Sequence, residues 1–279
     1  MEKPMVQIVI PVYRAEKTIR RCLDSVIGQT FRDWQAVLAD DASDDGSLDI
    51  LMEYAANDRR FTVLRHTQNQ GAAAARNTAM EHLFGEYTAF LDADDYWEPA
   101  MLETLVGAAT DNDCDVVQCR YLYDLPGGKQ IVPKGVFSRD MLLCGREMKK
   151  VYIKMMTGIN MNHVCMKLIR TSLIQNLRFD TALPTAEDLD FCVGLFCDVK
   201  RYYFINQPLY HYFRSGTSIT GSGLPFGERL KANRKVSRKM LSALPAWKTD
   251  SLFYKAMALA RPYIIMLSKV WRMLREKLA

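Results

Sequence analysis

The sequence has no apolar run that approaches the roughly 18 to 20 residues needed to cross a membrane, and its first residues, Met1 to Pro4, carry no signal-peptide pattern. Its seven cysteines are scattered without a C-x-x-C pair, and its four histidines show no H-E-x-x-H or other zinc spacing. A disulfide framework and a zinc ribbon are therefore not expected, and we predict a cytoplasmic protein with reduced thiols.

Hydrophobic residues make up 49% of the 279 residues, which suffices for a packed core. Acidic residues, in contrast, are nearly absent from the last part of the chain. Residues 1–200 carry 22 Lys and Arg against 29 Asp and Glu, a net charge of −7, whereas residues 201–279 carry 15 against 3, a net charge of +12. A basic segment on an acidic body suggests an anionic partner such as membrane lipid, a lipid diphosphate or nucleic acid.

The first hundred residues alternate between short apolar runs and segments with helical spacing. Strands are predicted at residues 6–10, 35–39, 61–65 and 87–91, and helices near 19–27, from about 50, and at 72–80. Pro11 is expected to end the first strand, because proline cannot donate a hydrogen bond in the centre of a sheet. This alternation predicts a mostly parallel α/β sheet flanked by helices.

Polar clusters fall where the first, second and fourth strands end, so they are expected to meet at one edge of the sheet. They contain Tyr13, Asp41 and the acidic turn Asp92-Ala93-Asp94-Asp95, and Arg76 lies on the helix between strands. An unpaired carboxylate after a buried strand is costly, and Mg²⁺ or Mn²⁺ is a natural partner. The alternative for the turn by itself is a solvated cap with Asp95 at the N-terminus of the next helix. The converging groups instead favour a site for a base, a ribose and a metal-bound diphosphate.

Six motifs in order carry a resemblance to a known family. They are Val9-Ile10-Pro11-Val12-Tyr13, Ser25 to Phe31, Asp40 to Ser47, Gly71 to Asn77, Phe90 to Asp95, and Glu187-Asp188. In this set the chain resembles the family 2 glycosyltransferases, which have the GT-A nucleotide-diphospho-sugar transferase fold. The chain departs from the family pattern at Arg14, where asparagine is usual, and at Ala42 and Ala79, where glycine is usual or frequent. None of these departures removes a carboxylate.

The resemblance implies a GT-A domain over residues 1–220, with a nucleotide-binding half at about 1–110 and an acceptor-binding half at about 111–220. Residues 221–279 would form a basic helical C-terminal extension. The implied activity is a metal-dependent, inverting transfer of a sugar from a nucleotide-diphosphate donor, a UDP-sugar foremost. The implied acceptor is a hydroxyl of a glycan or lipid-linked glycan in bacterial cell-surface polysaccharide synthesis, and the implied metal is Mn²⁺ or Mg²⁺.

The same resemblance assigns roles to individual residues. Tyr13 would stack on the base and Asp41 would accept its N–H, while Asp92 would hold the ribose or uridine and Asp94 the metal. Asp188 would be the general base. The other residues assigned to the nucleotide site are Pro11, Gly71, Arg76, Ala93, Arg214 and Ser218.

Two of these assignments have alternatives in the local pattern. Thr185, Glu187 and Asp188 also suit the N-terminal turn of a helix, and Asp190 is a rival base that would face away from Asp188. The Gly, Ser and Thr-rich stretch after His211 suits a lid over a diphosphate, with arginine as the phosphate-binding fork. It could equally be an exposed linker to the C-terminal helices.

The pattern after Phe226 is helical and basic, and the last helix is predicted to have one apolar face that includes Ile264 and Trp271. Two interpretations stay open: a cap that packs on the body or on a second subunit as a homodimer, and a basic amphipathic helix at the inner face of an anionic membrane.

The sequence allows three alternatives to sugar transfer. A nucleotidyltransferase is disfavoured because residues 11–15 contain no glycine-rich phosphate loop, and a nucleic-acid partner is disfavoured by the acidic body. A catalytically silent nucleotide-sugar-binding scaffold is the third alternative.

Overall fold

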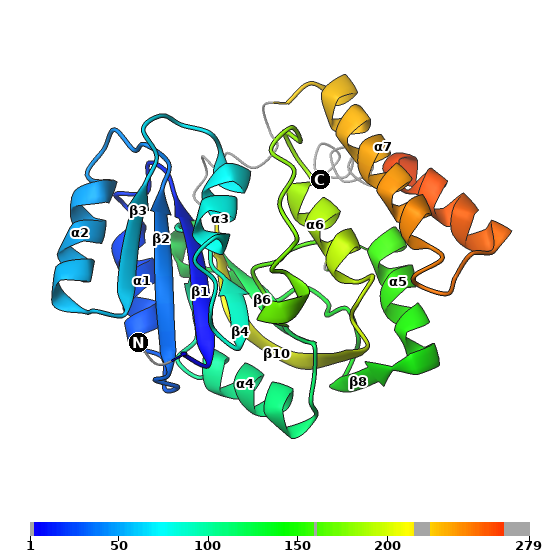
Figure 1. The fold of residues 1–279 in the computed structure, drawn as a ribbon, viewed down its shortest axis with the longest axis horizontal. Coiled ribbons are helices and arrows are strands. Elements are labelled where there is room, and N and C mark those ends of the chain that lie inside the picture. The colour runs from blue at the N-terminus through cyan, green and yellow to red at the C-terminus, as the bar shows by residue number, and fades with distance from the viewer. Residues whose placement is uncertain (1–2, 159–160, 215–223, 265–279) are drawn as a thin grey trace.

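A computed structural model describes residues 3–158, 161–214 and 224–264. One sheet with helices on both faces forms the body, and the last helices lie at one end of it (Figure 1). The strands are β1 (Val6–Val12), β2 (Trp34–Asp40), β3 (Phe61–Arg65), β4 (Tyr87–Phe90), β5 (Tyr96–Trp97), β6 (Val116–Asp124), β7 (Gln130–Ile131), β8 (Met141–Cys144), β9 (Lys167–Arg170) and β10 (Arg201–Phe213). The helices are α1 (Ile19–Ile27), α2 (Ser47–Asn57), α3 (Ala72–Met80), α4 (Met101–Asp111), α5 (Met148–Thr157), α6 (Glu187–Leu195) and α7 (Phe226–Ala243), with short 3₁₀ turns at η1 (Pro126–Gly128), η2 (Gly145–Glu147) and η3 (Thr171–Leu173).

The strand order is β3-β2-β1-β4-β9-β6-β10-β5, with β7 paired to β6 and β8 paired to β10. The pairs β1–β2, β1–β4, β2–β3 and β6–β10 are parallel, whereas β9 runs antiparallel to both β4 and β6. The predicted α/β fold is therefore confirmed, with a mixed sheet in which β1, β2, β3, β4, β6 and β10 run one way and the short strands β5, β7, β8 and β9 run the other. Because β9 lies between β4 and β6 and runs against both, β6 and β10 point the same way as β4, and their carboxyl ends reach the same edge.

Pro11 does not end the first strand as predicted, because β1 continues through it to Val12. Pro11 pairs with Ala39 of β2, while the pairing of β1 with β4 stops at Val9. The Val9 carbonyl accepts from the Leu91 amide, so the backbone of Pro11, two residues later, faces the same side beyond the end of β4. Proline has no N–H to donate on that side, which accords with the end of the β1–β4 pairing at Val9, while β1 stays paired with β2 as far as Val12.

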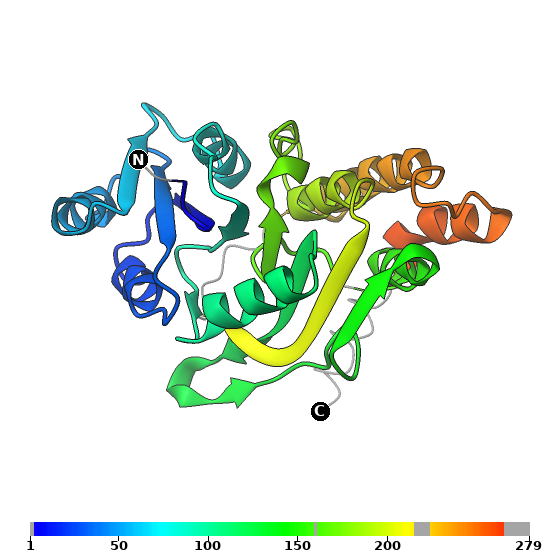
Figure 2. The same cartoon turned by 60° about the horizontal axis from the view of Figure 1, so that its bottom comes forward.

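Strand β10 is long and strongly curved, as Figure 2 shows. Its register with β6 shifts between Phe204 and Pro208 and again between Pro208 and Tyr210. A proline cannot donate to the ladder, so an irregularity at this position is expected. The bend lets the first half of β10 pair with β8 and the second half with β5, which directly follows the acidic turn.

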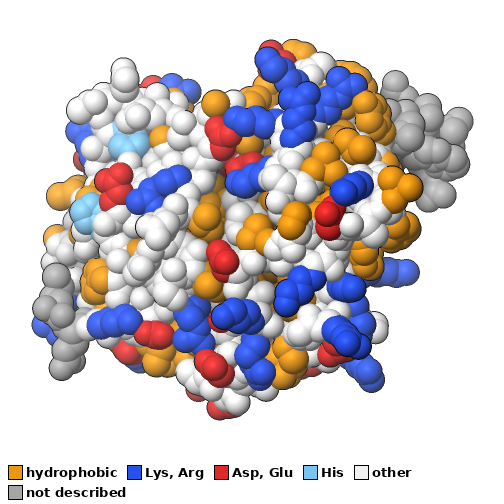
Figure 3. Space-filling model, turned by 45° about the vertical axis from the view of Figure 1, so that its right-hand side comes forward, with side chains coloured by type: hydrophobic (Ala, Val, Ile, Leu, Met, Phe, Trp, Pro, Cys, Tyr) orange, Lys and Arg blue, Asp and Glu red, His pale blue; other side chains and the backbone are white. Residues whose placement is uncertain are grey.

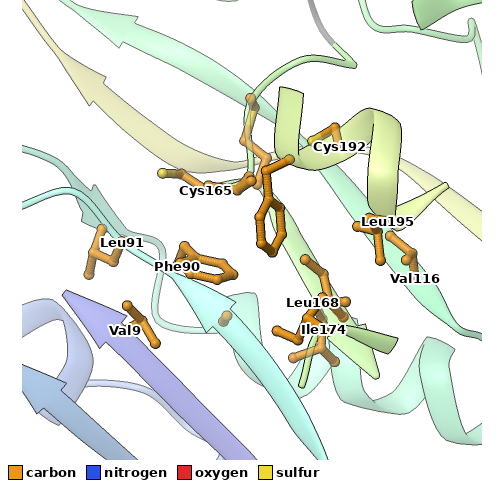
Figure 4. Close-up of a cluster of buried hydrophobic side chains, with 14 of the residues drawn as sticks. Val9, Phe90, Leu91, Val116, Cys165, Leu168, Ile174, Cys192 and Leu195 are labelled. Carbon is orange, nitrogen blue, oxygen red and sulfur yellow. The ribbon is translucent and has the colours of Figure 1, made fainter. Parts of the chain in front are cut away.

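A buried aromatic cluster joins β4 to α6. Phe90 of β4 contacts Phe179 and Phe191, whose rings stack with centroids 4.2 Å apart. Figure 4 shows Phe90 among apolar side chains from β9 and α6, including Leu168 and Cys192. Each such buried side chain contributes about 1.5 to 3 kcal/mol. This core fixes the strand that precedes the acidic turn against the helix that carries Glu187 and Asp188.

The C-terminal helices pack on α5 and α6. Apolar residues of α7, including Val236 and Met240, are buried, and Trp247 stacks on Tyr152 of α5 at 4.7 Å. Residues 252–264 are helical, and the buried Arg261 donates to the Met155 carbonyl. Beyond Ile264 the predicted last helix, with Trp271, lies outside the described residues. No helix in the described part of the chain is long and apolar enough to cross a membrane.

Candidate active site

The acidic turn after β4 is anchored by Asp95, which is 1% exposed. Its carboxylate accepts from the Tyr210 hydroxyl at 2.5 Å and from the Phe213 amide at 2.9 Å. Burial and the charges of Asp94 and Asp92 raise the pKa of Asp95 well above its usual value. The alternative that Asp95 caps the next helix is wrong, since α4 starts at Met101 after Ala100. Asp95 instead ties the turn to β10.

Arg76 of α3 joins carboxylates from two distant parts of the chain. The residue is 4% exposed, and its Nη2 donates to Asp92 Oδ1 at 2.7 Å. Its Nη1 lies 3.4 Å from Asp188 Oδ1 and 3.7 Å from Glu187 Oε1, and its guanidinium stands over the Phe179 ring at 5.4 Å. Burial alone would lower the pKa of Arg76, but the charges of Asp188 and Asp92 raise it well above its usual value.

The resemblance assigned Arg76 to the nucleotide site. In the structure its side chain is buried and contacts three carboxylates, those of Asp92, Glu187 and Asp188. Among the described residues, Arg76 Nη1 and Nε and Asp188 Oδ1 are buried without a hydrogen-bond partner. Native proteins rarely leave such atoms unsatisfied, and here Arg76 Nη1 and Asp188 Oδ1 compensate each other as an ion pair at 3.4 Å. Loss of water and the neighbouring Asp188 raise the pKa of Glu187.

Asp188 lies in the first turn of α6, which follows Ala186 in a left-handed conformation with φ of 67°. Its Oδ2 accepts from the Val164 amide at 3.4 Å, and its side chain is 18% exposed. The side chains of this segment do not cap α6. Asp190 faces another way and pairs with Lys239 of α7 at 2.6 Å. Of the two candidate bases, Asp188 is therefore the one beside Arg76 and Asp92.

Asp94 has an exposed side chain at the tip of the acidic turn. Its backbone carbonyl accepts from Arg21 Nη2 at 2.8 Å, which fixes the turn. Loss of surrounding water and the charge of Asp92 raise the pKa of Asp94 to about 6, although the carboxylate is open to solvent. The described residues contain no group of three or more His, Cys, Asp or Glu that could hold a metal. One or two carboxylates are nevertheless what Mg²⁺ takes when substrate phosphates complete the shell, so Asp94, with Asp92 nearby, fits this ion.

Tyr13 follows β1 and is 39% exposed. Arg14 lies over its ring at 5.2 Å and forms an ion pair with Asp44 at 2.6 Å. Arg14 and Ala42 both have positive φ, 48° and 58°, which explains why asparagine and glycine are usual at these positions in the family. Holding other residues there costs roughly 1 to 2 kcal/mol each.

Asp41 is buried and organises the turn before α3. Its Oδ1 accepts from His66 Nδ1 at 2.7 Å and from the Gln70 amide at 2.8 Å, and its Oδ2 accepts from the Gly71 amide at 2.7 Å. Gly71 has φ of 90° and ψ of 161°, a region that is essentially restricted to glycine. His66 is not predicted from the sequence, where its only signal is its place at the carboxyl end of the third strand.

A second network missed by the sequence analysis lies at the end of β10. The ring nitrogens of His211 contact Asp124 at 2.8 Å and Glu98 at 2.7 Å, and the ring stacks on Tyr96. One residue of the predicted nucleotide site, Arg214, neighbours this region and lies over the Tyr123 ring at 3.9 Å. Ser218, also assigned to that site, lies outside the described residues. Ala93, also predicted, is buried within the acidic turn.

The sheet, its helices and the residues at its carboxyl edge define the GT-A fold of nucleotide-diphospho-sugar transferases. The model of the family "Glycosyl transferase family 2" matches residues 7–178, and the chain belongs to this family.

Individual relatives were found by sequence and by structure. The chain is 32% identical over 219 residues to the uncharacterized glycosyltransferase EpsJ of Bacillus subtilis, covering 78% of this chain and 63% of EpsJ. It is 35% identical over 121 residues, 43% of this chain and 47% of the relative, to an Escherichia coli UDP-Glc:alpha-D-GlcNAc-diphosphoundecaprenol beta-1,3-glucosyltransferase, WfgD. The structure resembles that of S. aureus TarS 1-349 in complex with UDP, with a TM-score of 0.71, 22% identity, and coverage of 91% and 69% of the two chains.

Proposed function

We propose that this protein is an inverting glycosyltransferase that moves a sugar from a UDP-linked donor to a hydroxyl of a glycan or lipid-linked glycan in cell-surface polysaccharide synthesis. The observation that carries the proposal is the buried Arg76, which gathers Asp92, Glu187 and Asp188 beside the exposed Asp94. The UDP bound by TarS and the UDP-glucose and diphosphoundecaprenol in the description of WfgD support the donor and the acceptor class.

Residues 1–110 would hold the nucleotide and residues 111–220 the acceptor. Tyr13, more than a third exposed, offers its ring for stacking on the base. An ionised carboxylate has about four lone-pair positions, and three on Asp41 are used by His66, Gln70 and Gly71. One position therefore remains to accept the N–H of a uracil.

The diphosphate end of the donor would lie beside the acidic turn. Asp94 would hold Mn²⁺ or Mg²⁺, with Asp92 at the ribose side and fixed by Arg76. When bound, the ion supplies positive charge that stabilises the diphosphate as a leaving group. The buried Asp95 ties the turn to the Tyr210 hydroxyl, and Arg21 donates to the Asp94 carbonyl. These two contacts fix the backbone that carries the Asp94 side chain.

Asp188 would remove the proton from the acceptor hydroxyl. Its Oδ2 is held by the Val164 amide, and its Oδ1 has no hydrogen-bond partner within the described part of the chain. Arg76 Nη1 lies 3.4 Å from Oδ1 and places a positive charge beside the carboxylate. Attack by the activated hydroxyl on the face opposite the nucleotide would invert the anomeric centre, and a positioned base supplies roughly 10² to 10⁴-fold in rate.

A panel of UDP-sugars, with and without Mn²⁺, tests the proposal through UDP release and UDP binding. We expect metal-dependent release from one donor. Asp188→Asn should lower turnover by about 10² to 10⁴-fold while UDP binds nearly as in the wild type. Glu187→Gln is the matched control, because it neutralises the adjacent carboxylate, and it should retain far more activity.

The outcomes separate the alternatives. Normal turnover by Asp188→Asn would place the base elsewhere. Formation of UTP and sugar 1-phosphate when pyrophosphate is added, without release of UDP, would indicate a nucleotidyltransferase. Binding of a UDP-sugar without any turnover would indicate a scaffold.

We further propose that the C-terminal extension rests on an anionic membrane at the inner face of the cell. Large apolar side chains on the 252–264 helix are exposed, among them Leu252 at 84%, Phe253 at 62% and Leu259 at 55%. Ala258 and Arg261 of the same helix are buried, so the helix has an apolar outer face. Figure 3 shows hydrophobic side chains next to Lys and Arg side chains in the upper part of the molecule. Apolar area next to cations is the pattern that favours an anionic lipid surface.

Sedimentation with vesicles of anionic or neutral lipid tests this surface. The wild type should bind anionic vesicles, and Leu252→Ser with Phe253→Ser should weaken binding without unfolding the protein, because both side chains are already exposed. Absence of binding to either vesicle would refute the idea. A dimer that the same substitutions dissociate would show that a second copy covers this face.

A further inference from the structure

Lys167 is a fully buried cation that the proposed chemistry has not used. It is the first residue of β9, is 0% exposed, and donates from Nζ to the backbone carbonyls of Met161, at 3.2 Å, and His163. Within residues 3–158, 161–214 and 224–264 it forms no ion pair with a carboxylate. Burial of an ammonium group is costly, and it lowers the pKa of Lys167. We therefore expect a role of Lys167 that offsets the free-energy cost of burying its ammonium group.

The two carbonyls that Lys167 binds lie on the turn that reaches Asp188. Between them and β9, the Val164 amide donates to Asp188 Oδ2 at 3.4 Å. The Lys167 amide in turn donates to the Val164 carbonyl at 3.2 Å. The lysine therefore holds this turn through its side chain, at residues 161 and 163, and through its backbone, at Val164 itself.

Asp188 is consequently held from two directions. Arg76 lies on the Oδ1 side at 3.4 Å, and the turn fixed by Lys167 lies on the Oδ2 side. Asp188 sits at the start of α6, after the left-handed Ala186, where the side chains of the segment do not cap the helix. The turn and the arginine thus supply the contacts that fix its carboxylate.

We propose that Lys167 is a positioning residue for Asp188: it fixes the 161–164 turn so that the Val164 amide orients the carboxylate toward the acceptor hydroxyl. The inference rests on the proposed role of Asp188 as the base. A misplacement of about 1 Å in a catalytic group can cost on the order of 10²-fold in rate, so loss of this support should lower turnover more than donor binding.

The test compares Lys167→Met with Arg261→Met, a matched control that removes another buried cation bound to a backbone carbonyl far along the chain. The first readout needs no activity: hydrogen exchange of the Val164 amide by NMR. We expect Lys167→Met to lose at least about tenfold in protection, with no loss in the control. In turnover, Lys167→Met should fall by about 10 to 10²-fold with UDP affinity unchanged.

A combined variant shows whether the effect passes through Asp188. In the Asp188→Asn background, adding Lys167→Met should lower the residual turnover no further. Unchanged Val164 protection in Lys167→Met, or an equal loss of turnover with and without Asp188, would overturn the proposal.

Two further outcomes are distinguishable. If Lys167→Met does not fold, Lys167→Gln, which keeps a donor but loses the charge, takes its place, and intermediate protection of Val164 is expected. If the wild type transfers no sugar from any donor, the proposed function fails, while the exchange experiment still tests the support of the turn.

Discussion

The contact between α6 and α7 leads to a quantitative prediction for Lys239→Met. Asp190 of α6 has a side chain only 7% exposed, and Lys239 Nζ lies 2.6 Å from its carboxylate. Methionine keeps most of the apolar stem but leaves the carboxylate buried without a cation. Breaking a buried pair in this way costs about 3 to 5 kcal/mol. Because the lysine side chain is 36% exposed and water can reach the vacated space, we expect a loss of about 2 to 3 kcal/mol in the free energy of unfolding.

Urea unfolding of Lys239→Met, Asp190→Asn and the double variant measures this energy. The double variant should recover most of the stability, because it removes both the charge and its partner. Lys235→Met is the control, since the pair of Lys235 with Asp180 is more exposed, with 53% of the lysine side chain accessible, and its loss should cost under about 1 kcal/mol.

The same variant connects the C-terminal extension to catalysis. Asp190 is two residues from Asp188 on α6, so displacement of the helix should lower turnover while UDP binding at the other half of the site stays the same. A loss of less than about 0.5 kcal/mol for Lys239→Met, or no recovery in the double variant, would refute the reasoning.

Three further predictions concern the site. Arg76→Lys should destabilise the protein by about 2 to 4 kcal/mol in urea unfolding, because one ammonium cannot contact three carboxylates at once; wild-type stability would contradict this. Gly71→Ala should cost about 1 to 3 kcal/mol through backbone strain alone, since no atom lies within 4 Å of the added methyl group, and thermal melts would show it. For Asp94→Asn the test is pH dependence in EDTA. The folded carboxyl keeps its proton up to a pKa of about 6, whereas an unfolded one loses it near 3.9, so wild-type stability should fall as pH rises from about 4 to 6. The asparagine variant should show a flatter profile over that range, and an equal slope would show that Asp94 is not the cause.

Much of the nucleotide-binding half could be predicted because its signals are local. The predicted helix at residues 72–80 and the strand at 61–65 match the structure residue for residue. Apolar spacing within ten residues determines such elements, and parallel strands bring their carboxyl ends to one edge whatever the details of packing. The meeting of Tyr13, Asp41 and the acidic turn at that edge follows from the same rule.

The structure decided what depends on contacts between distant residues. Periodicity cannot show that Arg76 lies under Asp92 and Asp188, or that Asp190 turns away toward Lys239. Nor does it show that β9 runs against its neighbours, which places the turn bound by Lys167 next to α6.

The sequence by itself therefore determined the α/β alternation, the edge where the polar groups meet and the family. The tertiary structure decided that Asp188 lies beside Arg76 at the site, whereas Asp190 forms an ion pair with Lys239 of the C-terminal extension. The physical reason is that the burial and pairing of a charge depend on what packs against it, and the partners here, Arg76 with Asp188 and Asp190 with Lys239, lie far apart in the chain.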